Sequence, residues 1–126
     1  MTTQTTTPLT GRRILLVEDD YLLADALAQS LRSTGALVSG PIGTVDGALA
    51  AVAELDDIEA VVLDVNLNGI RVDAVADAVR ARGIPMVFVS GYDRNLLPPR
   101  FADVPHCLKP VDIDQLAATL AAQLRD

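Results

Sequence analysis

The sequence of 126 residues has only one cysteine, few aromatic residues and no excess of positive charge. The lone Cys107 excludes an internal disulfide, which fits a reducing cytoplasm. Tryptophan is absent and aromatic residues make up 3% of the chain, so the core must be aliphatic. A net charge of -7 argues against nucleic-acid binding, which needs a basic surface to displace counterions. No apolar run approaches the roughly 18 residues of a membrane helix, so we expect a cytoplasmic protein without a membrane partner.

The chain is long enough to form one domain with a substantial core. Its start is Thr-rich between Thr2 and Thr7 and is typical of neither a secretory signal nor a basic transit peptide. We therefore expect a disordered tail over residues 1–11 and one domain over residues 12–126. Because nothing after Asp126 could serve as an output domain, the domain is expected to stand alone, although its native ends would show whether it was cut from a longer chain.

Strand-like and helical patterns alternate five times along the chain. Strands are expected at Arg12–Val17, Ala36–Ile42, Ala60–Asp64, Pro85–Ser90 and Val104–Leu108. Helices are expected at Asp20–Thr34, from the cap Thr44 onward, at Ile70–Arg82, in a short form at Asp93–Phe101, and from the cap Asp112 onward. Pro41 places the second strand at an edge, and Pro98-Pro99 shorten the fourth helix. The alternation predicts an α/β fold: a doubly wound, five-stranded parallel sheet of flavodoxin-like order 2-1-3-4-5, with helices on both faces.

Polar residues lie where the predicted strands end. The acidic pair Glu18-Asp19 follows the first strand, and Asp64 ends the third. Ser90 ends the fourth strand, and Lys109, the only lysine in the chain, follows the fifth. Because open α/β sheets bind their ligands at the carboxyl ends of the strands, we expect these side chains to converge in space.

Three neighbouring carboxylates raise one another's pKa unless a cation lies among them, and Mg²⁺ suits such oxygen ligands. Asp64 is the best nucleophile because it stands alone at the end of a central strand, where its carboxylate can form an aspartyl phosphate. Mg²⁺ on Asp19 and Asp64, with Lys109 opposite, would neutralise the transferring oxygens, and Ser90 would offer its hydroxyl to the phosphate. Asp20 is interpreted equally well as a helix cap or as a further acid near the site.

The ordered pattern resembles the receiver domain of bacterial response regulators from about Arg12 to Leu124. It consists of Val17-Glu18-Asp19-Asp20, Asp64 after Val61-Val62-Leu63, Ser90-Gly91 and Lys109-Pro110. The resemblance implies that Asp64 accepts a phosphoryl group from a histidine kinase or a histidine phosphotransfer protein. Such a domain catalyses only its own phosphorylation and dephosphorylation, so it is a signalling domain and not an enzyme in the usual sense.

The resemblance also implies the roles of the other site residues. The implied groups at Mg²⁺ are Asp19, Asp64, the backbone carbonyl of Asn66 and, through water, Glu18. Ser90 and Lys109 would contact the phosphate, and the bond between Lys109 and Pro110 would be cis.

Departures from the family pattern narrow the resemblance. The usual Met-Pro after the phosphorylated aspartate is absent, and the loop reads Asp64-Val65-Asn66-Leu67-Asn68-Gly69. The fourth strand reads Val87-Phe88-Val89-Ser90-Gly91-Tyr92, which is similar to alphaproteobacterial stand-alone receivers with a Phe-Ala-Thr-Gly-Tyr-type motif and a reduced fourth helix. His106 takes the place of the usual aromatic switch residue, so Ser90, Tyr92 and His106 are the expected switch side chains. Residues 92–101 are expected to change their order on phosphorylation.

An enzyme is the main alternative, namely an aspartyl-phosphate phosphatase of the haloacid dehalogenase type. Such enzymes need a second Asp two residues after the nucleophile, where this chain has Asn66, which cannot transfer a proton. A Ser90–His106 hydrolase lacks the glycine expected two residues before its serine. The receiver interpretation is preferred, either as a signalling module or as a phosphate sink, and a monomer or weak homodimer is expected. The kinase, the target and the phosphate lifetime stay open.

Overall fold

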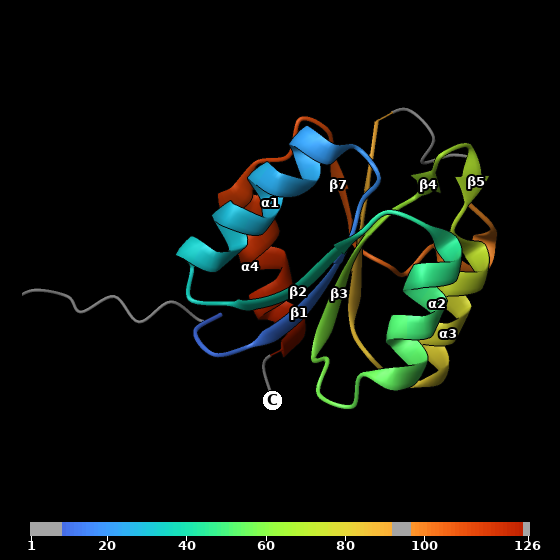
Figure 1. Cartoon of the computed structure of the whole chain (residues 1–126), viewed down its shortest axis with the longest axis horizontal. Helices are drawn as coiled ribbons and strands as arrows, with labels where there is room; N and C mark the ends of the chain where they lie inside the picture. The colour runs from blue at the N-terminus through green and yellow to red at the C-terminus, as the bar shows by residue number, and fades with distance from the viewer. Residues whose placement is uncertain (1–8, 92–96, 125–126) are drawn as a thin grey trace, which may run out of the picture.

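The computed structural model describes residues 9–91 and 97–124, which form a parallel sheet between two layers of helices (Figure 1). The five strands of this sheet are β1 (Arg13–Val17), β2 (Leu37–Ile42), β3 (Ala60–Asp64), β6 (Met86–Ser90) and β7 (His106–Leu108). They lie in the order β2-β1-β3-β6-β7, and every neighbouring pair is parallel. Counted along the chain, this is the order 2-1-3-4-5, so the predicted fold is confirmed, with the Pro41 strand at one edge.

The described residues contain four α-helices, α1 (Tyr21–Ser33), α2 (Val45–Glu54), α3 (Asp73–Ala81) and α4 (Ile113–Leu124). The predicted N-caps are confirmed for three of them. Asp20 Oδ1 accepts the N–H of Leu23 at 3.1 Å before α1, so the capping interpretation of Asp20 is correct. Thr44 Oγ1 caps α2 at 3.0 Å, and Asp112 Oδ1 caps α4 at 2.9 Å.

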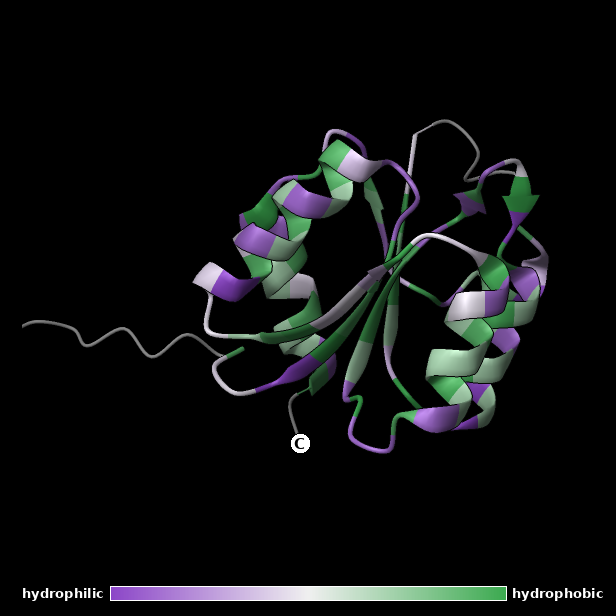
Figure 2. Ribbon diagram, in the orientation of Figure 1, coloured by the Kyte–Doolittle hydropathy of each residue, from purple (hydrophilic) through white to green (hydrophobic). Residues whose placement is uncertain are grey.

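Two aliphatic cores lie on the two faces of the sheet. One face carries Leu15 and Val17 and packs against α2 and α3, while the opposite face carries Ile14 and Leu16 and packs against α1 and α4. In Figure 2 the middle of the sheet is largely green, and purple residues are found on the helices and in the loops. Because both faces are covered, the central strands are buried along their whole length, as expected for a parallel sheet.

A small hairpin that the sequence analysis did not anticipate follows β3. Strands β4 (Asn66–Leu67) and β5 (Ile70–Arg71) pair antiparallel around the dipeptide Asn68-Gly69. Both turn residues have positive φ, 52° and 83°, which a two-residue hairpin turn of type I′ requires and which Asn and Gly tolerate best. Helix α3 consequently begins at Asp73, and the predicted helix start at Ile70 is wrong.

The expected fourth helix is reduced to a single 3₁₀ turn in the part that the structure describes, η2 (Pro99–Phe101). The rest of the expected helix, and Tyr92 before it, lie outside the described residues. Strand β7 begins at His106 and not at Val104, because the N–H of Val104 bonds to Phe101 O at 3.0 Å and closes the η2 turn.

A charged network fastens η2 to α3. Arg100 pairs with Asp77 through two hydrogen bonds of 3.0 and 2.9 Å, and Arg80 Nη1 donates to Arg100 O at 2.9 Å. Both guanidinium groups also lie over the buried ring of Phe101, at 4.6 Å for Arg100 and 5.6 Å for Arg80. The same ring packs edge-on against Phe88 at 5.8 Å, so η2 is fixed to β6 as well as to α3.

The packed domain starts earlier than predicted. Leu9 is 1% exposed and belongs to the core on the side of α1 and α4. The N–H of Arg12 donates to Leu9 O at 3.0 Å, and the N–H of Gly11 donates to Gly35 O at 2.9 Å. Residues 9–11 therefore belong to the domain and not to a tail, while residues 1–8 lie outside the described part. In the described ranges, none of the helices is both long and apolar enough to cross a membrane.

Cys107 on β7 is expected to resist alkylation in the folded protein. The residue is 2% exposed, and burial raises the pKa of its thiol, so little thiolate is present at neutral pH. Treatment with iodoacetamide should modify Cys107 only slowly in buffer and quickly in urea, as measured by intact-protein mass spectrometry. Equal rates in both solvents would contradict the buried position.

Candidate functional site

An acidic cluster forms where β1 and β3 end side by side. Val17 pairs with Leu63 in the sheet, so Glu18 and Asp64 follow in neighbouring positions. Glu18, Asp19 and Asp64 each offer a carboxylate oxygen, and these three atoms lie within 4.8 Å of one another. Glu18 and Asp64 are buried, at 3% and 4% exposure, while Asp19 is half-buried. The predicted convergence of the three carboxylates is therefore present in the structure.

Lys109 extends from the end of β7 into this cluster. Its Nζ donates to Asp64 Oδ2 at 2.9 Å and lies 3.3 Å from Glu18 Oε1. Burial alone would lower the pKa of Lys109, but the Asp64 and Glu18 carboxylates raise it overall, so the ammonium stays protonated. The N–H of Lys109 donates to Ser90 O at 2.8 Å, which continues the pairing of β6 with β7. The Lys109-Pro110 bond is cis, as the resemblance implied.

Glu18 is buried in the cluster beside Asp64 and Lys109. Burial, together with the neighbouring carboxylate of Asp64, raises the pKa of Glu18 to about 8. One of its oxygens, Oε2, accepts the N–H of Asp20 at 3.0 Å. The other, Oε1, is buried and has an ion pair with Lys109 but no hydrogen-bond partner among the described residues. The carboxylates of the cluster therefore offer more hydrogen-bond acceptors than the ammonium of Lys109 alone can satisfy.

These groups fit a hard divalent cation. Three carboxylates face one ammonium, and the buried Glu18 Oε1 lacks a hydrogen-bond donor. Oxygen donors of this kind are the ones that Mg²⁺ prefers, usually one or two carboxylates with water filling the remaining positions. The chemistry of the donor set therefore suits Mg²⁺.

The β4–β5 hairpin supplies two backbone donors to the cluster that the sequence analysis missed. The N–H of Asn66 donates to Asp64 Oδ1 at 3.0 Å, and the N–H of Asn68 donates to Asp19 Oδ2 at 2.8 Å. The side chain of Asn66 is engaged elsewhere, since its Oδ1 accepts the N–H of Gly69 at 2.8 Å. The signal for this turn is visible in the sequence, because Asn68-Gly69 is flanked by the apolar Leu67 and Ile70.

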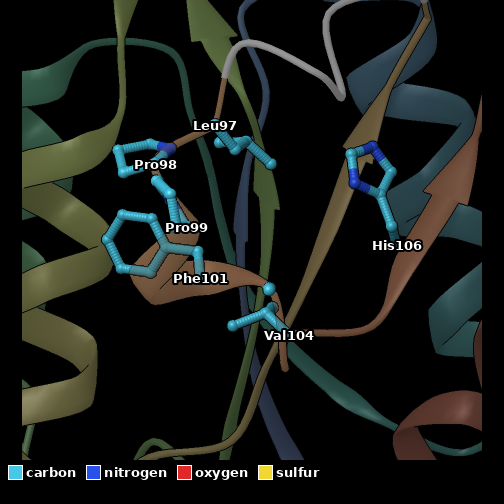
Figure 3. A pocket seen from close by; sticks show the side chains of 7 residues that line it. Leu97, Pro98, Pro99, Phe101, Val104 and His106 are labelled. Atoms are coloured by element: carbon cyan, nitrogen blue, oxygen red, sulfur yellow. The ribbon is translucent and has the colours of Figure 1, made fainter.

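Ser90 lies at the end of β6, and its hydroxyl hydrogen-bonds to Nε2 of His106 on β7. The register pairs Asp64 with Val89, so Ser90 is close to the acidic cluster at the same edge of the sheet. His106 also lines a pocket of about 300 Å³ with residues of the η2 region (Figure 3). The labelled lining residues are Leu97, Pro98, Pro99, Phe101, Val104 and His106. Of the three expected switch side chains, the structure joins Ser90 and His106, and Tyr92 lies outside the described residues.

Several solved structures share this fold over nearly the whole chain. SdrG from Sphingomonas melonis Fr1 is 41% identical, with 94% of this chain and 98% of SdrG covered and a TM-score of 0.79. The BeF3-activated conformation of SdrG from Pseudomonas melonis Fr1 is 38% identical, with 97% and 100% covered and a TM-score of 0.74. The receiver domain of the hybrid histidine kinase CckA is 28% identical, with 90% and 99% covered and a TM-score of 0.74.

A curated relative is similar over a shorter part of its length. The transcriptional regulatory protein PdtaR from Mycobacterium tuberculosis is 32% identical over an alignment of 112 positions, which covers 83% of this chain and 53% of PdtaR. The chain thus spans about half the length of this relative. No protein-family model matches the chain.

A flavodoxin-like sheet with an acidic cluster and a lysine at its carboxyl edge defines a signalling domain of the receiver class. Together with the match to SdrG over nearly all of both chains, it shows that the chain belongs to the response regulator receiver domains. Domains of this family generally use Mg²⁺, which agrees with the donor set found here.

Proposed function

We propose that Asp64 accepts a phosphoryl group in a Mg²⁺-dependent reaction and that the phosphorylated domain signals by binding another protein. The donor is a histidine kinase or a histidine phosphotransfer protein. The observation that carries the proposal is the position of Asp64, a buried carboxylate at the end of a central strand, 2.9 Å from Lys109 Nζ and among two further carboxylates.

The chemistry follows from the groups around Asp64. An oxygen of Asp64 would form the new bond to phosphorus as the P–N bond of the donor breaks, with its electron pair going to the donor imidazole. Bound Mg²⁺, held by Asp19, Asp64, the carbonyl of Asn66 and, through water, Glu18, would supply positive charge to the phosphoryl oxygens.

Lys109 and Ser90 would act on the other side of the phosphoryl group. The Lys109 ammonium already contacts Asp64 Oδ2. It would stabilise the negative charge that develops on the phosphoryl oxygens during transfer. The Ser90 hydroxyl would give up its hydrogen bond with His106 Nε2 and donate one to a phosphoryl oxygen instead. An activated conformation is known for SdrG with BeF3, a phosphoryl mimic, which supports a response of this kind here. We further propose that the domain belongs to the alphaproteobacterial group with a Phe-Ala-Thr-Gly-Tyr-type motif, on the resemblance of Phe88-Val89-Ser90-Gly91-Tyr92 to that motif.

A phosphatase of the haloacid dehalogenase type has no support in the geometry. The residue two positions after Asp64 is Asn66, whose side-chain oxygen holds the hairpin turn through Gly69. A general acid is therefore missing at the position where that chemistry needs one.

Incubation with acetyl phosphate and Mg²⁺ should add one phosphoryl group to the wild-type protein, because acetyl phosphate can replace the histidine donor. Intact-protein mass spectrometry would measure the addition, and hydroxylamine should remove it as expected for an acyl phosphate. The Asp64→Asn variant should show no addition, since its amide is not a nucleophile, and a chelator should block the wild-type reaction.

The matched control is Asp56→Asn, which makes the same chemical change at an exposed position. This variant should label like the wild type. Labelling that persists in Asp64→Asn, or that proceeds equally in the chelator, would refute the proposed site.

A further inference from the structure

The turn of the β4–β5 hairpin lies against the acidic cluster. Figure 1 shows the hairpin at the end of the sheet where α1 begins, which is the end that carries Glu18 and Asp19. Asn68 occupies the first turn position with φ 52°, a conformation that few residues other than Gly and Asn adopt readily. In this conformation the backbone N–H of Asn68 reaches Asp19 Oδ2 at 2.8 Å.

A second contact of Asn68 joins it to Gly43, which is a neighbour of Asp19. Its Nδ2 donates to Gly43 O at 3.3 Å, in the loop between β2 and α2. Gly43 itself packs against Asp19, because a Cβ added there would lie 3.4 Å from the Asp19 Cα and 3.8 Å from its Cβ. Asp19 therefore lies against both Gly43 and Asn68, and the side chain of Asn68 joins the loops that contain these two residues.

Strand β4 of the same hairpin also orients the second carboxylate, that of Asp64. The N–H of Asn66 holds Asp64 Oδ1 at 3.0 Å, so the hairpin fixes one oxygen of each of the two aspartates. Asp19 is half-buried. Its Oδ2 accepts a backbone N–H, whereas Asp64 Oδ2 accepts a hydrogen bond from the Lys109 ammonium. A carboxylate held at one oxygen loses less rotamer freedom when a cation binds it, which strengthens binding without a new contact to the ion.

We propose that Asn68 is a positioning residue for Asp19 and that, through its turn and its bond to Gly43, it sets the affinity of the site for divalent cations. The inference rests on the proposed function in that it takes Asp19 as a metal ligand. Asn68 itself need not touch the ion, and its effect is transmitted through the Asp19 carboxylate.

Two variants separate the parts of this role. Asn68→Gly keeps the positive φ and the backbone N–H but removes the bond to Gly43 O. Asn68→Ala also removes that bond. In addition, alanine has no side-chain hydrogen bond with which to stabilise the left-handed conformation at this position, so the turn itself is weakened. Asn68→Gly should weaken Mg²⁺ binding about three- to tenfold, the effect of losing one modest hydrogen bond, and Asn68→Ala should weaken it at least as much.

Mg²⁺ affinity would be measured as the increase of the urea unfolding midpoint with Mg²⁺ concentration, starting from chelated protein. A general loss of stability does not affect this measurement, because each variant is compared with its own chelated state. In parallel, the Mg²⁺ concentration for half-maximal labelling by acetyl phosphate should rise by the same factor, while the rate at saturating Mg²⁺ stays near that of the wild type.

Ile70→Ala is the matched control, because Ile70 lies in the same hairpin, is 58% exposed and is not part of the acidic cluster. It should bind Mg²⁺ like the wild type. Unchanged affinity in both Asn68 variants would overturn the inference and leave the proposed function intact, and an equal loss in Ile70→Ala would overturn it in favour of a general effect of the hairpin. A wild-type protein that does not bind Mg²⁺, or an Asp19→Asn variant that binds it equally well, would instead refute the metal-dependent function and this inference with it.

Discussion

Replacement of Lys109 by alanine should reduce phosphoryl acceptance from acetyl phosphate by about 100-fold or more at saturating Mg²⁺, the usual cost of losing one preorganised donor at a developing charge. The reason is that Lys109 Nζ is 2.9 Å from Asp64 Oδ2, and the chain has no other lysine. Initial labelling rates from mass spectrometry would provide the measurement. A rate within a fewfold of the wild type would show that Lys109 does not assist the transfer.

Lys109→Arg is the informative companion variant because it keeps the charge and changes the shape. A planar guanidinium does not fit a position built for a compact ammonium between Asp64 and Glu18. We expect Mg²⁺ binding to be retained and the response to phosphorylation to be impaired. A large loss of Mg²⁺ affinity in a metal titration would mean instead that Lys109 shapes the metal site.

Truncation of Phe88 to alanine should lower the free energy of unfolding by about 3 to 5 kcal/mol, the usual range for a buried aromatic residue. Phe88 is fully buried on β6 and packs against the rings of Phe101 at 5.8 Å and His106 at 6.1 Å. Since domains are stable by only about 5 to 15 kcal/mol, the variant should be close to unfolding at moderate temperature. Urea denaturation followed by circular dichroism would measure the change.

Tyr21→Ala is the control for this truncation because it removes an aromatic ring that is 82% exposed. Its free energy of unfolding should stay within about 0.5 kcal/mol of the wild type. Similar losses in the two variants would contradict the assignment of Phe88 to the core.

The arrangement of the sheet and the candidate site could be predicted from the sequence because both depend on where strands end. Aliphatic runs such as Ala60–Asp64 and Met86–Ser90 are fully buried, so their limits are marked by a single polar residue. Those polar residues then meet at one edge because parallel strands all end there. Thus Asp64 and Lys109, which are far apart in the chain, could be expected to lie together.

Contacts that depend on side-chain geometry could not be predicted in this way. The strands of the β4–β5 hairpin have two residues each, too few for a period-2 pattern, and only Asn68-Gly69 marks the turn. The pairing of Ser90 with His106 depends on the register of β6 against β7, which no local pattern encodes. The start of the domain at Leu9 depends on one apolar residue beside a polar stretch.

The strand that positions the only lysine is also the shortest strand of the main sheet and lies at its edge. Strand β7 has three residues and, within residues 9–91 and 97–124, pairs only with β6, through Phe88, Val89 and Ser90. Burial of Cys107 in the core on the side of α1 and α4 fixes this short strand to the domain. The position of the Lys109 ammonium beside Asp64 therefore depends on the pairing of this one short strand with β6.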